Sequence, residues 1–183
     1  MPEAYMTQKE IMNEEEMSRT LTRMVSQIIE SVKENDGICL VGIRRGGAHL
    51  ASRLADILKT AGRKDVLLGF LDITLYRDDL TTIHDYPVLH GTEIDFDVCG
   101  RHIILVDDVV FTGRTTRAAM DALIDLGRPK KISLASLIDR GHRELPIQPD
   151  FVGKVVPTSL NEIIEVRLKE QAGNDCVLIQ KTA

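Results

Sequence analysis

The chain has 183 residues and a formal net charge of −5 at pH 7, with 28% charged and 43% hydrophobic residues. This length suits one domain with a sizeable core, and the residue balance is ordinary for a soluble globular protein. No apolar run approaches the ~20 residues of a membrane helix, and the N-terminus has no apolar signal-peptide core, so we expect a cytoplasmic protein. The negative charge argues against bulk electrostatic binding of nucleic acid but leaves room for a local basic patch.

The first predicted helix covers residues 14–34. Asn13 is its predicted N-cap, with Glu16 at the N3 position of a capping box. Apolar residues recur at helical spacing and predict a buried stripe of Met17, Leu21, Met24, Ile28 and Val32.

Strands and helices then alternate along the chain. The pattern predicts strands at 38–43, 66–76, 103–106 and 131–138, helices through Ala61 and over 117–126, a loop at 142–150, and a closing hairpin of strands 163–168 and 176–180. Residues 77–100 show no period and predict an arm or flap. This order predicts a single α/β domain over 1–183, with a doubly wound, mostly parallel sheet, flanking helices and ligands at the carboxyl ends of the strands.

The three cysteines, Cys39, Cys99 and Cys176, lie far apart without any C-x-x-C pair. Neither a disulfide framework nor a zinc site is indicated, and Cys39 and Cys176 are expected to be small buried hydrophobes. No metal site built from protein ligands alone is predicted.

The most informative segment begins at the apolar strand 103–106, which ends in Asp107 and Asp108 before Thr112-Gly113-Arg114-Thr115. Gly113 lets the backbone approach an anion, and the first N–H groups of the following helix point at it. The two carboxylates would repel a phosphate but suit the hydroxyl groups of an attached sugar. A ribose 5-phosphate site is the economical interpretation; the alternative is an acidic turn in which Thr115 only caps a helix.

Two further segments carry cations beside predicted strands. Arg44-Arg45-Gly46-Gly47, between a strand and a helix, could hold a second anion such as a pyrophosphate, although a plain polar turn is the alternative. Arg77 opens the predicted flap and could close over developing negative charge, unless it belongs to an ordinary surface charge cluster.

The segment after strand 131–138 could read a planar base. Asp139 and the backbone would face the base edge while Ile138 packs on its face, and a plain turn is the alternative. His142, Arg143 and Lys154, with Arg19 and Arg23 of the first helix, could form a basic patch for RNA, against the default of scattered solvated cations.

Several segments together resemble one family of bifunctional pyrimidine operon regulators and uracil phosphoribosyltransferases, the PyrR family. They stand in order at 72–79, 106–109, 112–115, 120–123, 127–129, 139–146, 153–154 and 157–159. The resemblance runs from the first helix to the end and implies a type I phosphoribosyltransferase fold. It also implies synthesis of UMP from uracil and phosphoribosyl pyrophosphate, and UMP-dependent binding to leader mRNA that promotes transcription termination.

The resemblance also assigns roles. Asp107 and Asp108 would hold the ribose hydroxyls, and Arg77 would reach the pyrophosphate as the arm closes. Substrate would also contact Arg44, Arg45, Val109, Phe111, Thr112, Gly113, Arg114, Thr115, Ile138, Asp139 and Arg140; RNA would contact Thr22, Arg23, His142, Arg143 and Lys154. Mg²⁺ would bind mainly through the pyrophosphate and ribose of the substrate, and a homo-oligomer, a dimer or larger, is expected.

Two departures from the family pattern matter. The usual pyrophosphate loop reads Thr-Arg-Gly after a variable residue, where this chain has Arg45-Gly46-Gly47, and Ser26 and Gln148 replace a frequent His and Arg. Losing basic side chains weakens phosphate contacts. Two alternatives stay open: a phosphoribosyltransferase for another base without RNA regulation, and an RNA-binding regulator with little catalysis.

Overall fold

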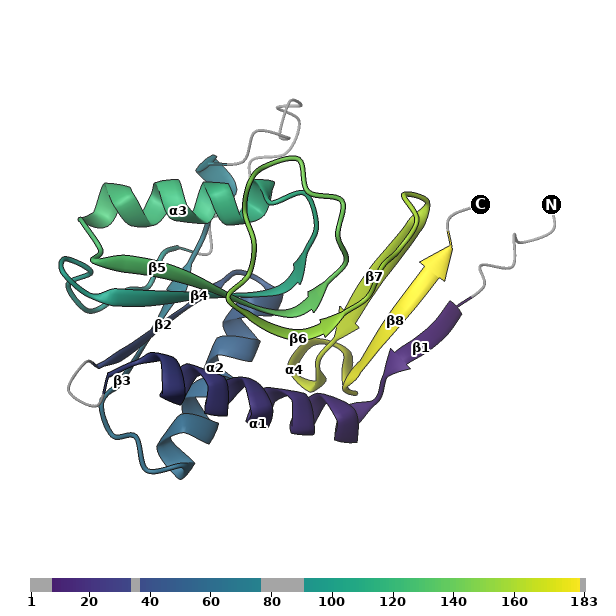
Figure 1. Cartoon of the computed structure of the whole chain (residues 1–183), viewed down its shortest axis with the longest axis horizontal. Coiled ribbons are helices and arrows are strands. Elements are labelled where there is room, and N and C mark those ends of the chain that lie inside the picture. The colour runs from purple at the N-terminus through teal and green to yellow at the C-terminus, as the bar shows by residue number, and fades with distance from the viewer. Residues whose placement is uncertain (1–7, 34–36, 77–90, 182–183) are drawn as a thin grey trace.

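A central parallel sheet organises the structure, a computed structural model that describes residues 8–33, 37–76 and 91–181 (Figure 1). Its strands are β2 (Ile38–Ile43), β3 (Val66–Leu71), β4 (His102–Val110), β5 (Lys131–Asp139) and β6 (Phe151–Val155). They run in the order β3-β2-β4-β5-β6, and every neighbouring pair is parallel. The predicted doubly wound, mostly parallel α/β sheet is confirmed.

Helices cover both faces of this sheet. α1 (Glu14–Ser31) and α2 (Gly46–Thr60) lie on one face, and α3 (Arg114–Leu126) lies on the other (Figure 1). Two short helical segments, η1 (Thr74–Tyr76) and α4 (Lys169–Ala172), complete the set. In the described part of the chain, every helix is too short or too polar to cross a lipid bilayer.

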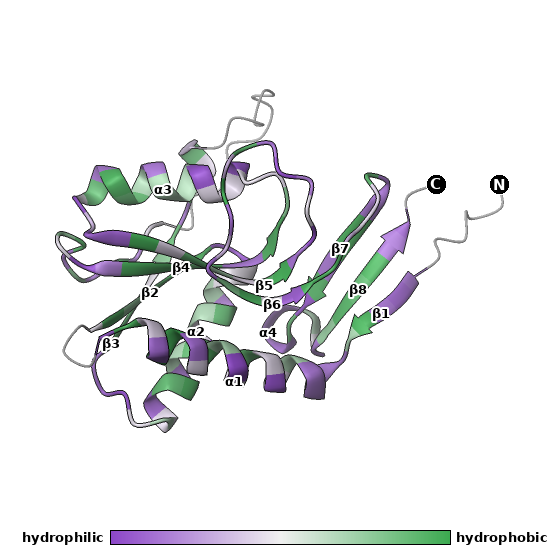
Figure 2. Cartoon of the chain, viewed as in Figure 1, coloured by the Kyte–Doolittle hydropathy of each residue, from purple (hydrophilic) through white to green (hydrophobic). Residues whose placement is uncertain are grey.

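The first helix follows the sequence prediction closely. The Asn13 side chain accepts from the Glu16 N–H, and Glu16 accepts from the Asn13 N–H, each at 2.9 Å, so the capping box is confirmed. All members of the predicted stripe, Met17, Leu21, Met24, Ile28 and Val32, are buried. Figure 2 shows hydrophobic and hydrophilic residues alternating along α1 and α3, as expected of helices that cover a sheet on one side. The helix ends at Ser31 rather than at residue 34.

A second, antiparallel sheet lies beside the first, with strands β1 (Gln8–Met12), β8 (Cys176–Lys181) and β7 (Glu162–Arg167) in that order. The predicted closing hairpin is confirmed as β7–β8, whereas β1 and β6 were missed. β1 is short and mostly exposed, so it carries no apolar alternation that a pattern could detect. Arg53 of α2 ties this sheet to the body through ion pairs with Glu170 and Asp175.

The third predicted strand needs correction, and only part of the predicted arm is described. β3 ends at Leu71 rather than at residue 76, because Asp72 Oδ1 accepts from the Thr74 N–H at 2.9 Å and starts η1. Of the predicted arm, residues 77–90 lie outside the described residues. Residues 91–100 are irregular and mostly exposed, although Glu93 bridges to Phe70 and Val98 is buried. The arm over residues 77–100 stays a prediction.

Gly153 sets the distance between α1 and the edge strand β6. A Cβ atom at this position would overlap the Leu137 carbonyl oxygen of β5 and lie 2.9 Å from Thr20 Cγ2 of α1. Any side chain here must push β6 away from β5 or α1 away from the sheet. The residue is therefore fixed by backbone packing.

We predict that Gly153→Ala lowers the free energy of unfolding by about 1–3 kcal/mol, the usual cost of overpacking. For a chain of this size, each kcal/mol lowers Tm by about 2–4 °C, which thermal denaturation would measure. Gly37→Ala is the matched control, because its added Cβ would have its nearest neighbour, Asp65 O, at an ordinary 3.4 Å. Equal Tm values for the two variants would contradict the packing argument.

Candidate active site

The two acidic residues lie at the carboxyl end of β4, and they face opposite sides of the sheet. Asp107 lines a cavity together with the loop that leads into α3. Asp108 points to the other side, where its Oδ2 atom lies against Gly46 at the start of α2. This split follows from the strand itself, because β4 continues to Val110 rather than ending at 106, and successive strand residues alternate in direction.

Burial makes the carboxylate pair electrostatically unusual. Asp107 is 6% exposed, and burial raises its pKa well above the ordinary aspartate value, with the neighbouring Asp108 carboxylate adding to the shift. Burial also raises the pKa of Asp108. Each carboxylate accepts one backbone N–H from the next residue, at 3.0 Å for Asp107 and 2.8 Å for Asp108. These two bonds offset only part of the desolvation, so the site holds protons readily.

The predicted phosphate loop leads directly into α3. Gly113 has φ +92°, a left-handed conformation that favours glycine, and α3 begins at Arg114 rather than at 117. Thr115 and Thr116 therefore belong to the first helical turn, where backbone N–H groups lack partners within the helix. The Thr112 hydroxyl accepts from the Arg114 N–H at 3.3 Å and holds the turn closed.

A cavity of about 320 Å³ lies between this loop and Asp107. Most of the predicted β4–α3 residues line it, namely Asp107, Val109, Phe111, Thr112, Gly113, Arg114 and Thr115. Val110, Thr116 and Glu144 also line it and were not predicted as site residues. Glu144 forms an ion pair with Arg114 at 2.7 Å, across 30 positions of sequence that carry no local signal. The cavity has the size and donors for a small anionic ligand.

The second predicted loop reaches this site with its backbone but not with the Arg44 guanidinium. Glycines 46 and 47 let the start of α2 lie against the end of β4. Arg44 instead pairs with Glu93 at 2.7 Å and stacks 5.7 Å from the centre of the Phe70 ring. Arg45 is exposed. Neither arginine lines the cavity, and Arg77 lies outside the described residues.

The predicted base-reading residues are buried beside the cavity rather than in its wall. Ile138 is fully buried, and Asp139 and Arg140 are 7% and 6% exposed. Arg140 donates to Thr158 Oγ1 at 3.0 Å and to the Glu162 carbonyl at 2.6 Å, and it stacks on the Phe111 ring at 4.0 Å. Burial lowers the pKa of Arg140. Its guanidinium thus holds the turn before β7 and does not line the cavity.

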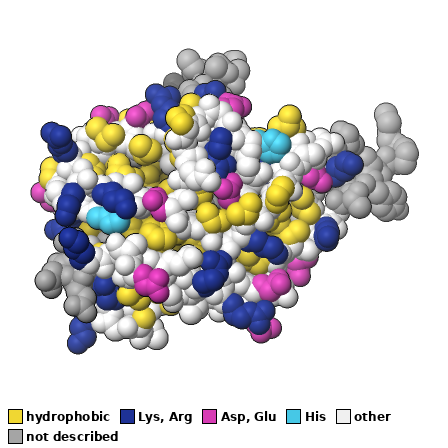
Figure 3. Space-filling view, viewed as in Figure 1, with side chains coloured by type: hydrophobic (Ala, Val, Ile, Leu, Met, Phe, Trp, Pro, Cys, Tyr) yellow, Lys and Arg dark blue, Asp and Glu magenta, His cyan; other side chains and the backbone are white. Residues whose placement is uncertain are grey.

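The residues assigned to RNA fall into two groups. Arg23 and Lys154 line a second cavity of about 340 Å³ between α1 and β6, and Thr22 is exposed on the same helix. Figure 3 shows Lys and Arg side chains over this part of the surface, interspersed with acidic ones. The other two residues follow β5. His142 Nε2 lies 2.5 Å from the Thr158 carbonyl oxygen, and Arg143 is turned inward with 19% of its side chain exposed.

Comparisons with known proteins identify the family and the fold. Residues 7–171 match the model of the phosphoribosyl transferase domain family. Proteins named bifunctional protein PyrR are 54% identical in Acetivibrio thermocellus (93% of this chain, 92% of that protein) and 55% in Pelotomaculum thermopropionicum (95% and 96%). The hypoxanthine phosphoribosyltransferase structure of Trypanosoma cruzi is similar with a TM-score of 0.71 and 16% identity, covering 96% and 97% of the two chains. The hypoxanthine-guanine phosphoribosyltransferase of Bacillus anthracis gives 0.69 and 20%, covering 95% and 97%. Both solved structures share the fold of this chain.

Asp107→Asn should raise thermal stability at pH 7 while abolishing turnover. The folded state holds the Asp107 proton more tightly than the unfolded chain does, so stability falls as pH rises above the ordinary aspartate pKa of about 3.9. Asparagine does not ionise, so the variant avoids this loss of stability. Its Tm, measured from pH 4 to 8, should fall less steeply with pH than that of the wild type. A steeper fall, or a lower Tm at pH 7, would show that the carboxylate stabilises the fold.

Thr115→Val should weaken binding of phosphoribosyl pyrophosphate roughly ten- to a hundredfold, the usual effect of deleting a hydroxyl that donates to a charged group. Equilibrium dialysis would measure the dissociation constant. Thr60→Val is the control, since the Thr60 hydroxyl only donates to the Asp56 carbonyl at the far end of α2. If both variants bind like the wild type, Thr115 serves the helix and not a ligand.

Proposed function

The chain belongs to the phosphoribosyl transferase domain family and, within it, to the bifunctional PyrR proteins, and on this premise we propose two linked activities. The protein converts uracil and phosphoribosyl pyrophosphate into UMP and pyrophosphate, and with UMP bound it attaches to pyrimidine operon leader mRNA to attenuate transcription. The observation that carries the catalytic part is the cavity in which Asp107 faces the Thr112–Thr115 loop. A sugar with a terminal phosphate fits this cavity, because its hydroxyl groups can donate to Asp107 while its phosphate accepts from the Thr112–Thr115 loop.

The reaction joins a uracil ring nitrogen to the ribose C1′ atom. The C1′–oxygen bond to pyrophosphate breaks, the leaving group takes the electron pair, and the ring nitrogen loses its proton. The loop around Gly113 would fix the 5-phosphate through N–H groups and threonine hydroxyls. Asp107, which lines the cavity, would accept from the ribose hydroxyls and stabilise the positive charge that develops on the sugar. Asp108 was predicted to share this role, but it lies on the other face of β4 against Gly46.

Mg²⁺ fits the donor set as a substrate-bound ion. Across residues 8–33, 37–76 and 91–181, no cluster of three or more His, Cys, Asp or Glu side chains could hold a metal. Asp107 offers carboxylate oxygens of the kind that Mg²⁺ prefers at the cavity wall, and the remaining ligands would come from the substrate and water. When bound, the ion would neutralise charge on the departing pyrophosphate.

Two other functions were open from the sequence, and the comparisons do not favour them. The solved hypoxanthine phosphoribosyltransferases share the fold at 16–20% identity, whereas the relatives above 50% identity are bifunctional PyrR proteins. Pyrophosphate release measured with uracil, guanine and hypoxanthine tests the base. Turnover that is undetectable with uracil but present with a purine would overturn the proposal.

The RNA part rests on the cations between α1 and β6. Arg23 donates to the Val152 carbonyl at 3.3 Å, and Lys154 donates to the Ile11 carbonyl at 2.7 Å, so both head groups are held at the surface. Because the chain carries a net charge of −5, RNA must be recognised through such a local patch. Thr22, exposed on α1, would add a polar contact beside this patch, and His142 would act separately, from the segment after β5.

Arg23→Gln and Lys154→Gln should each weaken UMP-dependent binding of leader RNA. Each lost phosphate contact should flatten the slope of log Kobs against log salt by roughly 0.7–0.9, which gel shifts at several salt concentrations would measure. Lys181→Gln at the end of β8 is the charge-matched control. A slope unchanged in the two test variants would mean that RNA binds elsewhere.

A further inference from the structure

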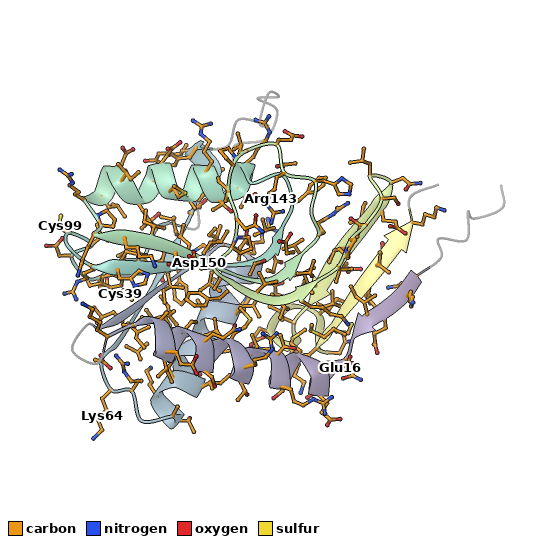
Figure 4. All side chains as sticks on the ribbon, in the orientation of Figure 1. Glu16, Cys39, Lys64, Cys99, Arg143 and Asp150 are labelled. Atoms are coloured by element: carbon orange, nitrogen blue, oxygen red, sulfur yellow. The ribbon has the colours of Figure 1, made fainter. Side chains whose placement is uncertain are left out.

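Arg143 is the most extensively bonded side chain in the segment that follows β5. Its Nε donates to the Ile147 carbonyl at 2.9 Å, and Nη1 donates to the Phe111 carbonyl at 2.8 Å and to the Gly141 carbonyl at 3.2 Å. Nη2 pairs with Asp139 Oδ1 at 2.7 Å. In Figure 4 Arg143 lies near the start of α3.

These contacts leave Arg143 little capacity for an external ligand. A guanidinium has five N–H groups, and the contacts to Ile147, Phe111, Gly141 and Asp139 use four of them. Only 19% of the side chain is exposed. A two-pronged contact with an RNA phosphate would have to break bonds to buried carbonyls or to a nearly buried carboxylate.

The groups that Arg143 connects belong to two different parts of the proposed active site. Phe111 begins the phosphate loop and lines the 320 Å³ cavity. Asp139 is the carboxylate predicted to read the base. The backbone reinforces the connection, since the Glu144 and Leu145 N–H groups donate to the Thr112 carbonyl at 2.9 and 3.2 Å.

We propose that Arg143 is a positioning residue for the phosphoribosyl transfer rather than a contact to RNA. It fixes the spacing between the phosphate loop and the Asp139 carboxylate, and so between the phosphate and the base of one bound nucleotide. This inference rests on the proposed function, because it assumes that UMP occupies that cavity. The fork geometry is what matters: lysine keeps the charge but cannot bridge four separated acceptors.

The test compares Arg143→Lys with Arg143→Gln. In both variants, KM for phosphoribosyl pyrophosphate and for uracil should rise about tenfold or more, in line with lost bonds to a charged group, while kcat changes less. A role confined to folding would lower kcat through the active fraction and leave KM unchanged. The dissociation constant of UMP, measured by equilibrium dialysis, should rise in parallel.

The matched control is Arg63→Lys at the opposite end of the sheet. Arg63 pairs with Asp65 at 2.7 Å, and 16% of its side chain is exposed, which is close to the value for Arg143. It precedes β3, at the end of the sheet opposite the cavity. Its KM values should equal those of the wild type. In the double variant Arg143→Lys/Asp139→Asn, the loss of UMP binding energy should be smaller than the sum of the two single losses, because Arg143 acts partly through Asp139.

RNA binding separates this role from a phosphate contact. At saturating UMP, Arg143→Gln should keep the wild-type salt slope, whereas a lost phosphate contact would flatten it by roughly 0.7–0.9. Unchanged KM values with a flattened slope would overturn the inference and leave the proposed function intact. A wild-type protein that neither binds UMP nor turns over uracil would overturn both.

Discussion

The close packing of the β2–α2 turn against the end of β4 is the constraint on which the site depends. A Cβ at Gly47 would overlap the Val106 carbonyl oxygen, and one at Gly42 would lie 2.6 Å from Ala48 Cα. With side chains at these positions, α2 could not begin where it does. Asp108 would then lose its place against the first turn of that helix. The glycines therefore serve the carboxylate pair through backbone geometry.

This packing also explains the unusual electrostatics of the pair. Asp107 and Asp108 point to opposite faces of one strand, yet both are enclosed: one by the phosphate loop and the other by the start of α2. The enclosure raises the pKa of both groups, with burial as the main cause. A fold gains no stability from two carboxylates placed this way. Such placement is typical of sites that give up stability for function.

The sequence predicted the elements well and the long-range partners poorly. Strand β2, the capping box at Asn13 and the β7–β8 hairpin depend on periodicity and local hydrogen bonds, which a pattern contains. By contrast, Arg44 pairs with Glu93 and Arg140 donates to the Glu162 carbonyl. Neither contact can be predicted from the residues next to it in the sequence. The turn at Thr112–Thr115 was predictable because strand, glycine and helix start are adjacent in the chain. Glu144 reaches the same cavity from a distant segment.

The same reasoning applies to the charges. A count of cations from the sequence treats each arginine as available to a polyanion, but the fold engages several of them internally. Arg53 pairs with Glu170 and Asp175, and Arg143 with Asp139 and three carbonyls. Because these two side chains pair with carboxylates and are only 21% and 19% exposed, they contribute little to counterion release on RNA binding. Under the proposed function, affinity for RNA would come from the exposed cations of α1 and β6. A family motif alone does not distinguish these from arginines that hold the protein together.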